Sequence, residues 1–416
     1  MIKRNIAGIL LEALADSPVV LLNGARQTGK STLVQWLSEG QHPARYLTMD
    51  DATVLAAAAE DPTGFIQGLK GPVILDEIQR VPALFPPIKV EVDRHRTAGR
   101  FLLTGSANVL LLPDLSESLS GRMEILTLWP FSAGELGSVT ETFIDMAFSG
   151  RPLLLPASSL SRSELFRRIV AGGFPEAVQR TTPRRRRAWF GSYITTILQR
   201  DVRDLANIEH LTALPRLLAL LAARATTLLN LSELSRSAGL AQSTLKRYMA
   251  LLETTFLVQL LPPWSANLGK RLVKSPKILL SDAGLMAHLL GLGNGPAGLG
   301  SHVAGPLLEN FVAMELRKQA AWSETQPQMF HFRTQTGQEV DIVLEDARGR
   351  VVGVEVKAAS SVSASDFRHL KALREALGDR FIRGVVLHTG SESVPFSGDL
   401  LALPVSALWQ ARAPGP

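Results

Sequence analysis

The segment with the clearest chemistry is Gly24-Ala-Arg-Gln-Thr-Gly29-Lys30-Ser31, which has the spacing G-x-x-x-x-G-K-S. Glycines at these positions let backbone N–H groups turn inward on a phosphate, and the start of a helix adds a favourable partial charge. Lys30 is expected to reach the β- and γ-phosphates of ATP, and the Ser31 hydroxyl to ligate Mg²⁺. The expected nucleotide-binding residues are Gly24, Ala25, Arg26, Gln27, Thr28, Gly29, Lys30, Ser31, Thr32 and Asp76.

Two carboxylates follow a short apolar run further along the chain, in Val73-Ile74-Leu75-Asp76-Glu77. Two acids at the end of a buried strand cost free energy unless a cation or a reaction uses them. Asp76 is expected to hold Mg²⁺ through water. Glu77 is expected to orient and deprotonate the water that attacks the γ-phosphate. Glu77 and Lys30 are therefore the first two catalytic candidates, and an exposed strand end is the alternative interpretation.

A third apolar run, Phe101-Leu-Leu-Thr104-Gly105-Ser106, ends in hydroxyl groups. A hydroxyl beside the acidic pair could hydrogen-bond the attacking water and so sense the state of the nucleotide. Ser106 is the first choice for this catalytic role and Thr104 the second. A structural turn is the alternative.

The elements that position these residues can be predicted from residues 18–128. Short apolar runs without period-two alternation are typical of a parallel sheet buried on both faces. Because helical stretches separate the runs, the pattern predicts α/β architecture. The helix Ser31–Leu37 is expected to follow the phosphate loop. The expected strands are Val19–Leu22, Tyr46–Thr48, Val73–Leu75, Phe101–Thr104 and Ile125–Leu128.

Several of these motifs resemble one large prokaryotic family of AAA+ P-loop ATPases with an uncharacterised C-terminal domain. The similar segments are Gly-Ala-Arg-Gln-Thr-Gly-Lys-Ser-Thr, Leu-Asp-Glu-Ile-Gln, Leu-Leu-Thr-Gly-Ser and Ser-Gly-Arg. Gly172–Glu176, Gln199–Asp201, Ser281–Leu285 and Leu308–Asn310 extend the resemblance over nearly the whole chain. The resemblance implies a homo-oligomer, with a hexameric ring as the expected form. It also implies that Arg122, just before the last strand, is an arginine finger for a neighbour's γ-phosphate; a surface arginine is the alternative.

A Pro/Ser-rich stretch, Pro156–Ser163, and a Gly-rich stretch, Gly291–Gly300, indicate boundaries between domains. Together with the resemblance, they predict four domains. Residues 1–155 form an AAA+ P-loop ATPase core and residues 156–220 a helical lid. Residues 221–285 form a winged-helix-like domain and residues 286–416 an α/β domain like PD-(D/E)xK nucleases.

The winged-helix prediction depends on two helical segments, Leu231–Leu240 and Ala241–Leu252, with Gly239 at the turn. Apolar residues of the second helix face a core and leave polar and basic residues outward, as in a recognition helix. The stretch Phe256–Leu261 and the following basic pair are expected to form the wing. The expected DNA-binding residues are Ser243, Lys246, Arg247, Lys270 and Arg271. A helical module that only packs ATPase subunits is an equal alternative. The run Arg184–Arg187 either touches phosphates or is a solvated helix face.

The C-terminal segment has acidic residues at the spacing of the PD-(D/E)xK nuclease core, which it resembles. Asp341 and Glu355 are expected to coordinate Mg²⁺ or Mn²⁺ through oxygen, and Glu309 from a helix to complete the carboxylate cluster. Lys357, on the same strand face as Glu355, is expected to help activate water or to steady the pentavalent phosphate. The proline usual before the aspartate is replaced by Val340, and Glu339 could substitute in the cluster. A nuclease-like fold without cleavage activity, used for binding or assembly, is the alternative.

Composition sets outer limits on function. The 416 residues contain no cysteine, which excludes disulfides and thiol catalysis and fits a reducing cytosol. The N-terminal residues show no export signal, and no apolar run reaches the roughly 18 residues of a membrane span. We therefore expect a cytoplasmic protein without a membrane partner. The net charge of +6 permits a nucleic-acid partner without requiring one.

Three functional hypotheses follow from these motifs. The first is an oligomeric ATPase that uses ATP and Mg²⁺ to remodel DNA, including branched DNA, or to translocate along it. The second is a regulatory switch in which the nucleotide state controls a protein partner. The third is a defence or toxin-like nuclease that is regulated by the ATPase domain.

Overall fold

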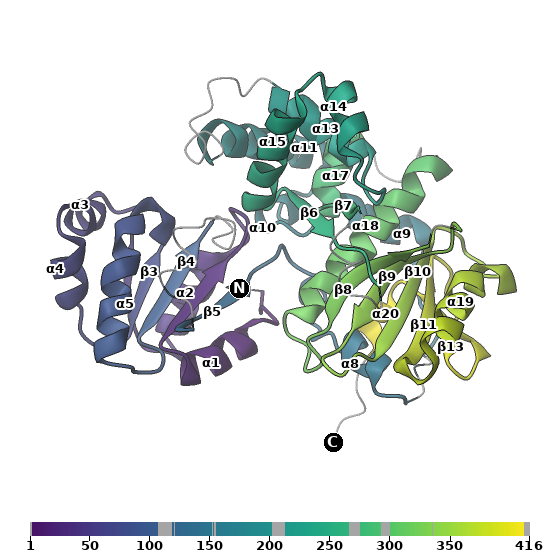
Figure 1. Ribbon diagram of the computed structural model, residues 1–416, viewed down its shortest axis with the longest axis horizontal. Helices are drawn as coiled ribbons and strands as arrows, with labels where there is room; N and C mark the ends of the chain where they lie inside the picture. The colour runs from purple at the N-terminus through teal and green to yellow at the C-terminus, as the bar shows by residue number, and fades with distance from the viewer. Residues whose placement is uncertain are drawn as a thin grey trace. The chain divides into compact units, whose positions relative to one another are not determined.

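A computed structural model describes residues 2–106, 119, 121–151, 153, 155–201, 213–265, 275–292, 300–334 and 336–411; the side chains of residues 200, 201 and 301 are not described. The chain divides into two compact units (Figure 1). The first comprises Lys3–Phe131 and Ala250–Leu257, and the second comprises Ser132–Met249 and Val258–Pro416. Among the described residues, no helix is both long and apolar enough to cross a membrane.

The first unit is built on a five-stranded parallel sheet with the strand order β2-β3-β4-β1-β5. The strands are β1 (Val19–Asn23), β2 (Arg45–Thr48), β3 (Val73–Asp76), β4 (Phe101–Gly105) and β5 (Met123–Thr127). Strands β1, β3 and β4 are buried along their whole length, as their uninterrupted apolar runs require. All five predicted strands are confirmed, each within two residues.

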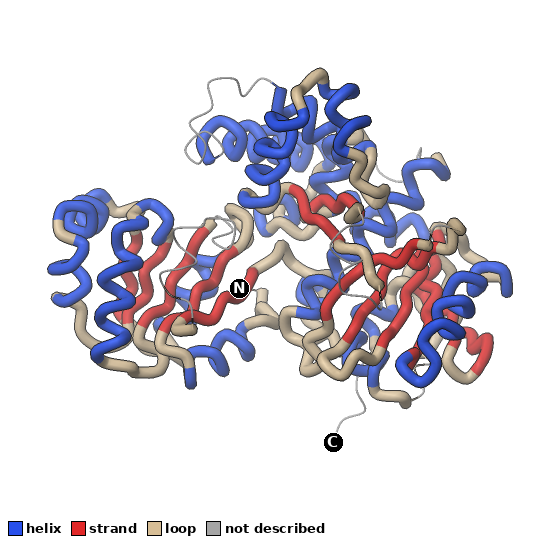
Figure 2. Tube along the Cα trace, in the orientation of Figure 1, coloured by secondary structure: helices blue, strands red, loops and turns tan. Residues whose placement is uncertain are grey.

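Helices cover this sheet (Figure 2). They are α1 (Ala7–Asp16), α2 (Lys30–Ser38), α3 (Ala52–Glu60), α4 (Pro62–Gln67) and α5 (Phe85–Arg94), with 3-10 turns at Ile78–Arg80 and Pro82–Leu84. One core lies between the sheet and α5, where Leu21, Leu75 and Leu103 pack with Phe85 and Ile88, all without exposed area. The helix predicted after the phosphate loop is α2.

The second unit begins with a mainly helical region. Its helices are α7 (Ala133–Leu136), α8 (Phe143–Phe148), α9 (Arg162–Ala171), α10 (Pro175–Val178), α11 (Pro183–Thr196), α13 (Leu214–Ala223), α14 (Leu231–Ala238), α15 (Gln242–Thr254) and α17 (Ala283–Leu289), with a π-helical turn at Ile197–Asp201. The residues of α15 from Ala250 on belong to the first unit. Gly239 ends α14 with φ +70°, a conformation that favours glycine. The predicted helix–turn–helix pair is therefore α14 and α15. Strands β6 (Val258–Leu261) and β7 (Lys277–Leu280) form an antiparallel pair after it.

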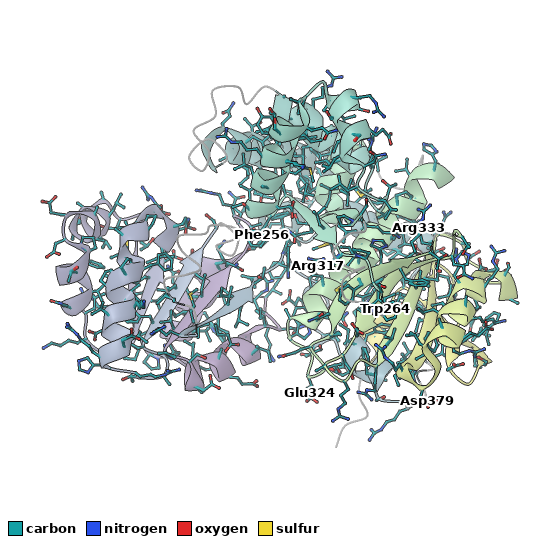
Figure 3. All side chains as sticks on the ribbon, viewed as in Figure 1. Phe256, Trp264, Arg317, Glu324, Arg333 and Asp379 are labelled. Carbon is teal, nitrogen blue, oxygen red and sulfur yellow. The ribbon has the colours of Figure 1, made fainter. Side chains whose placement is uncertain are left out.

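The C-terminal part of the second unit is a mixed six-stranded sheet with the order β12-β13-β11-β10-β9-β8. Its elements are α18 (Ser301–Ala320), β8 (Gln328–Arg333), β9 (Glu339–Glu345), β10 (Val351–Lys357), α19 (Arg368–Leu377), β11 (Phe381–His388), β12 (Val394–Ser397), β13 (Leu400–Pro404) and α20 (Ala407–Gln410), with 3-10 turns at Ala364–Phe367 and Gly378–Arg380. Trp264, labelled in Figure 3, packs into the core of this sheet with Phe330 and Leu370. The sequence predicts a helix at Leu307–Gln319 and strands near Met329–Arg333, Asp341–Leu344 and Val351–Val356. They are confirmed as α18, β8, β9 and β10, whereas β11, β12 and β13 were not predicted.

Candidate nucleotide site and C-terminal carboxylate cluster

The phosphate loop connects β1 to α2 through two glycines in conformations that other residues rarely adopt. Gly24 has φ +144° and Gly29 has φ +95°. A Cβ on Gly24 would lie 2.2 Å from the carbonyl oxygen of Leu128, so a side chain has no room there. Lys30 is 4% exposed, and its Nζ donates hydrogen bonds to the carbonyls of Gly24 and Ala25, both at 2.8 Å. The loop therefore curves around the lysine ammonium at the first turn of α2.

Two side chains hold the loop in this shape. Thr28 Oγ1 donates to the Ala25 carbonyl at 2.9 Å. Arg4 is buried and donates to the carbonyls of Thr28 at 2.8 Å and Trp129 at 2.6 Å. Arg4 was not predicted, because nothing in its local sequence indicates that it reaches the loop. Of the other predicted loop residues, Gln27 and Thr32 are exposed and Arg26 is half-buried.

Asp76 is the hydrogen-bonding centre of the site. It is 2% exposed and accepts hydrogen bonds from the hydroxyls of Ser31 at 2.9 Å, Tyr46 at 2.7 Å and Thr104. Burial, with the hydrogen bond to Asp76 and its charge, raises the pKa of Tyr46. Ser31 and Asp76, the two predicted Mg²⁺ residues, are thus brought together from α2 and β3. Mg²⁺ prefers oxygen ligands, and the Ser31 hydroxyl and the Asp76 carboxylate are of this kind.

Glu77 lies directly beyond β3 in a left-handed backbone conformation, with φ +59°. Non-glycine residues seldom adopt this conformation, and when they do they are often at functional sites. The Glu77 amide donates to Thr104 Oγ1 at 3.0 Å. Ser106 Oγ donates to Glu77 Oε2 at 3.3 Å, and Gln79 Nε2 donates to both Ser106 Oγ, at 2.8 Å, and Glu77 Oε2. At Glu77, Thr104 therefore binds the backbone amide, whereas Ser106 binds the side-chain carboxylate.

Gln79 was not predicted as a site residue, although the motif Leu-Asp-Glu-Ile-Gln contains it. The sequence feature that could have identified Gln79 is its position two residues beyond Glu77. The 3-10 turn at Ile78–Arg80 brings its side chain to the end of β4, where it bridges Glu77 and Ser106.

A second group of charged residues lies in the C-terminal part of the second unit. Asp341 on β9 accepts a hydrogen bond from the Val356 amide of β10 at 2.9 Å. Lys277 on β7 enters the same group: its Nζ lies 2.8 Å from Glu309 Oε1, 2.8 Å from Glu339 Oε1 and 3.4 Å from Asp341 Oδ1. Lys277 was not predicted here, since it is 64 residues before Asp341 in the sequence.

Three segments of the chain match known families. Residues 16–137 match an AAA domain, residues 162–295 a domain of unknown function (DUF8612) and residues 304–408 another (DUF4143). Uncharacterised proteins of Mycobacterium bovis and Mycobacterium tuberculosis are each 34% identical over 409 residues, 98% of this chain and 84% of the relative. The chain belongs to this family of AAA-domain proteins.

Solved structures resemble it more distantly. The Thermotoga maritima RuvB Holliday junction branch migration motor has a TM-score of 0.29 at 16% identity, over 62% of this chain and 89% of that one. A Drosophila ORC structure bound to DNA has a TM-score of 0.20 at 13% identity, over 69% of this chain and 85% of that one. At these scores the resemblance carries no argument about function.

The predicted arginine finger of this AAA-domain protein forms an ion pair. Arg122 donates from Nε and from a terminal nitrogen, at 3.2 Å, to the two carboxylate oxygens of Asp93 on α5. The hydrogen bond from Arg122 lowers the pKa of the exposed Asp93. The role of Arg122 in a neighbouring subunit stays a prediction.

The predicted recognition helix is α15. Its apolar residues Leu245, Met249 and Leu252 are buried, and Ser243, Lys246 and Arg247 are exposed. Gln242 at its start donates to Ser232 Oγ on α14 at 3.1 Å, which fixes the two helices at the turn. Lys270 and Arg271, predicted for the wing, lie outside the described residues. In the run Arg184–Arg187 on α11, Arg186 is half-buried and the other three are exposed.

Two acids of the carboxylate cluster in the second unit have strongly raised pKa values. Burial, and then the charge of Asp341, raises the pKa of Glu355 to about 10 and that of Glu309 to about 8. Lys357 lies close enough to Glu355 to oppose this shift. Within the described part of the chain, no three His, Cys, Asp or Glu side chains form a group suited to a metal ion. Glu309 and Glu355 each lie close enough to Asp341 to feel its charge. The Lys277 ammonium lies among these carboxylates.

Proposed function

We propose that this AAA-domain protein is an oligomeric ATPase that couples ATP hydrolysis to the binding and remodelling of DNA. The observation that carries the ATPase part is the convergence of Lys30, Ser31, Asp76, Glu77 and Ser106 at the ends of β1, β3 and β4. Carboxyl ends of parallel strands are where α/β proteins bind ligands. Membership of an AAA-domain family supports the same assignment.

Each residue has a distinct role in this proposal. The loop amides and Lys30 bind the phosphates, and Ser31 and Asp76 hold Mg²⁺, which neutralises phosphate charge when bound. Glu77 accepts a proton from the attacking water while the water oxygen bonds to the γ-phosphorus and the bond from the γ-phosphorus to the ADP oxygen breaks. Ser106 and Gln79 orient the Glu77 carboxylate by hydrogen bonds. In the oligomer, Arg122 exchanges Asp93 for the γ-phosphate of a neighbouring subunit.

The DNA part of the proposal is supported by α14 and α15. Two helices joined at Gly239, with an exposed serine, lysine and arginine on the second, have the chemistry of a DNA-recognition helix. The antiparallel strands β6 and β7 follow, as in a wing. The division of residues 156–416 into a lid, a winged-helix-like domain and a nuclease-like domain, at the boundaries given above, belongs to this proposal.

The test is ATP turnover by the purified protein, measured without DNA and with single-stranded, duplex and branched DNA. We expect DNA to stimulate turnover and Lys30→Ala to abolish it. Glu77→Gln should trap ATP-bound assemblies that stay locked on DNA. If those assemblies form but release DNA, the protein is a regulatory switch. Turnover that is the same with every DNA, together with no salt-sensitive DNA binding, would refute the proposal.

A further inference from the structure

Lys277 occupies the centre of the C-terminal carboxylate cluster. Its side chain is 1% exposed, and its ammonium lies 2.8 Å from carboxylate oxygens of both Glu309 and Glu339. A buried ammonium is stable only when such partners compensate the loss of hydration. The Asp341 carboxylate lies 3.4 Å from the same nitrogen, so three carboxylates surround one buried ammonium.

The backbone fixes Lys277 in this position. Strand β7 pairs with β6 on one side, where Lys277 lies opposite Leu261. On the other side, Leu228 forms a bridge to Lys277. Asn310, next to Glu309 on α18, closes the arrangement: its amide accepts from the Leu280 amide at 2.8 Å and donates to the Leu280 carbonyl at 3.0 Å. Lys277 thus belongs to a strand that has pairing partners on both of its edges.

A divalent cation and this ammonium compete for the same oxygens. Mg²⁺ takes oxygen ligands, usually water and one or two carboxylates, at about 2.0–2.1 Å in octahedral geometry. Glu309 and Asp341, two of the predicted ligands, both have an oxygen within 3.4 Å of the Lys277 nitrogen. A metal ion bound between them would lie against a positive charge that is shielded from water. The residues present therefore do not fit a resident metal while Lys277 is in place.

We propose that Lys277 takes the place of the divalent cation, so that Glu309, Glu339 and Asp341 are neutralised by cations of the chain itself and the domain serves binding or assembly without metal-dependent cleavage. Arg333 at the end of β8 (Figure 3) adds to this neutralisation, since it lies 3.4 Å from Glu339 Oε2. The proposal does not depend on the ATPase function, because every residue in it belongs to the second unit.

The first test is Mn²⁺ binding to the full chain without nucleotide, measured by electron paramagnetic resonance. We compare wild type, Asp341→Asn, Lys277→Met, and Lys277→Met combined with Asp341→Asn. The nucleotide site is the same in all four, so differences report the C-terminal cluster. We expect Lys277→Met to gain one Mn²⁺ that binds about tenfold or more tightly than any in wild type, because one buried repulsive charge is gone. The double variant should lose that Mn²⁺.

Arg383→Met is the control. Arg383 is also a buried cation of the second unit, but its guanidinium donates to two backbone carbonyls, those of Met146 at 3.0 Å and Arg151 at 2.6 Å. Its removal should not create a Mn²⁺ site, because the partners described for it are carbonyls and not carboxylates. If wild type itself binds one Mn²⁺ that Asp341→Asn removes, the metal displaces the ammonium and the proposal is wrong.

A second measurement needs no variant and covers the case in which Lys277→Met does not fold. Native wild type is treated with an amine-acetylating reagent, and modification is mapped by mass spectrometry with and without Mn²⁺. Lys277 should stay unmodified in both samples, while the exposed Lys371 reacts in both. Modification of Lys277 only when Mn²⁺ is present would mean that metal expels it from the cluster, contrary to the proposal.

Discussion

Ser106 donates a hydrogen bond to the Glu77 carboxylate at 3.3 Å, which connects the end of β4 to the acid beyond β3. Gln79 donates to both side chains, so the three form a closed group. Such a group restricts the carboxylate to one orientation. Restricting a general base matters because the water must be aligned with the γ-phosphate.

Removal of the Ser106 hydroxyl should therefore slow hydrolysis without weakening nucleotide binding. We expect Ser106→Ala to lower kcat by about 10- to 100-fold, with KM for ATP changed little. Gln79→Ala should have an effect of the same kind. Steady-state kinetics measure both, and Ser38→Ala on α2, a half-buried serine bonded only to a backbone carbonyl among the interactions described, is the control. A raised KM with unchanged kcat would assign Ser106 to binding instead.

Gly24 provides a test of the loop backbone. Gly24→Ala places a methyl group 2.2 Å from the Leu128 carbonyl oxygen and requires an unfavourable φ. The loop must shift, so we expect the affinity for ATP to fall by at least about tenfold. Gly8→Ala is the matched control. No atom lies within 4 Å of its added Cβ, and an alanine inside α1 should raise stability slightly. Calorimetric titration with nucleotide would separate the two variants.

Arg122 and Asp93 allow the finger role to be separated from a structural one. If Arg122 acts in trans, Arg122→Ala should strongly reduce ATP turnover at unchanged nucleotide affinity. Asp93→Ala breaks the same ion pair but leaves the arginine available, so its turnover should stay near that of wild type. The pair is exposed and contributes little to stability. Equal loss of activity in both variants would show that the ion pair, and not the finger, is required.

The residues predicted for the nucleotide site lie together in the structure because their determinants are local. Apolar runs locate the strands, and the residues at their carboxyl ends meet at one edge of the sheet. The contributions of Arg4 and Lys277 were missed because each depends on which distant segment packs beside it. The family motifs Gly172–Glu176 and Ser281–Leu285 show the same limit. They meet where Asp282 accepts a hydrogen bond from the Gly173 amide at 2.7 Å, a contact that spacing alone does not predict.

The pH dependence of stability should depend in part on Glu141. This residue is 2% exposed and accepts a hydrogen bond from the Gly134 amide at 2.8 Å. Burial, and then the charge of Glu315, raises its pKa from 4.5 to about 7. The folded state therefore binds the proton more tightly than the unfolded state. The resulting stabilisation is complete below pH 4.5 and is lost as the pH rises through about 7.

Glu141→Gln keeps the shape of the protonated acid and cannot ionise. At pH 8 we expect it to be more stable than wild type by roughly 1–3 kcal/mol, and at pH 5 the difference should nearly vanish. Denaturant titrations of the full chain at the two pH values measure this. Glu324→Gln, at an exposed position labelled in Figure 3, should show no such change. A glutamine variant that loses stability at pH 8 would mean that Glu141 is charged in the folded protein.

The salt dependence of DNA binding tests α15. Each lysine or arginine that contacts a phosphate releases condensed counterions, so its removal should flatten the plot of log affinity against log salt by about one unit. We expect this change for Lys246→Ala and for Arg247→Ala, each on duplex DNA of any sequence. Ser243→Ala carries no charge change and should leave the slope unaltered even if affinity falls.

Lys371→Ala on α19 is the charge-matched control for these variants, since it removes an exposed lysine from another surface of the second unit. Fluorescence anisotropy over a series of salt concentrations gives all the slopes. If Lys371→Ala changes the slope as much as Lys246→Ala does, the binding follows overall charge and α15 is not a recognition helix. A slope altered only by the α15 variants would place the phosphate backbone along that helix, because counterion release reports contact and not net charge.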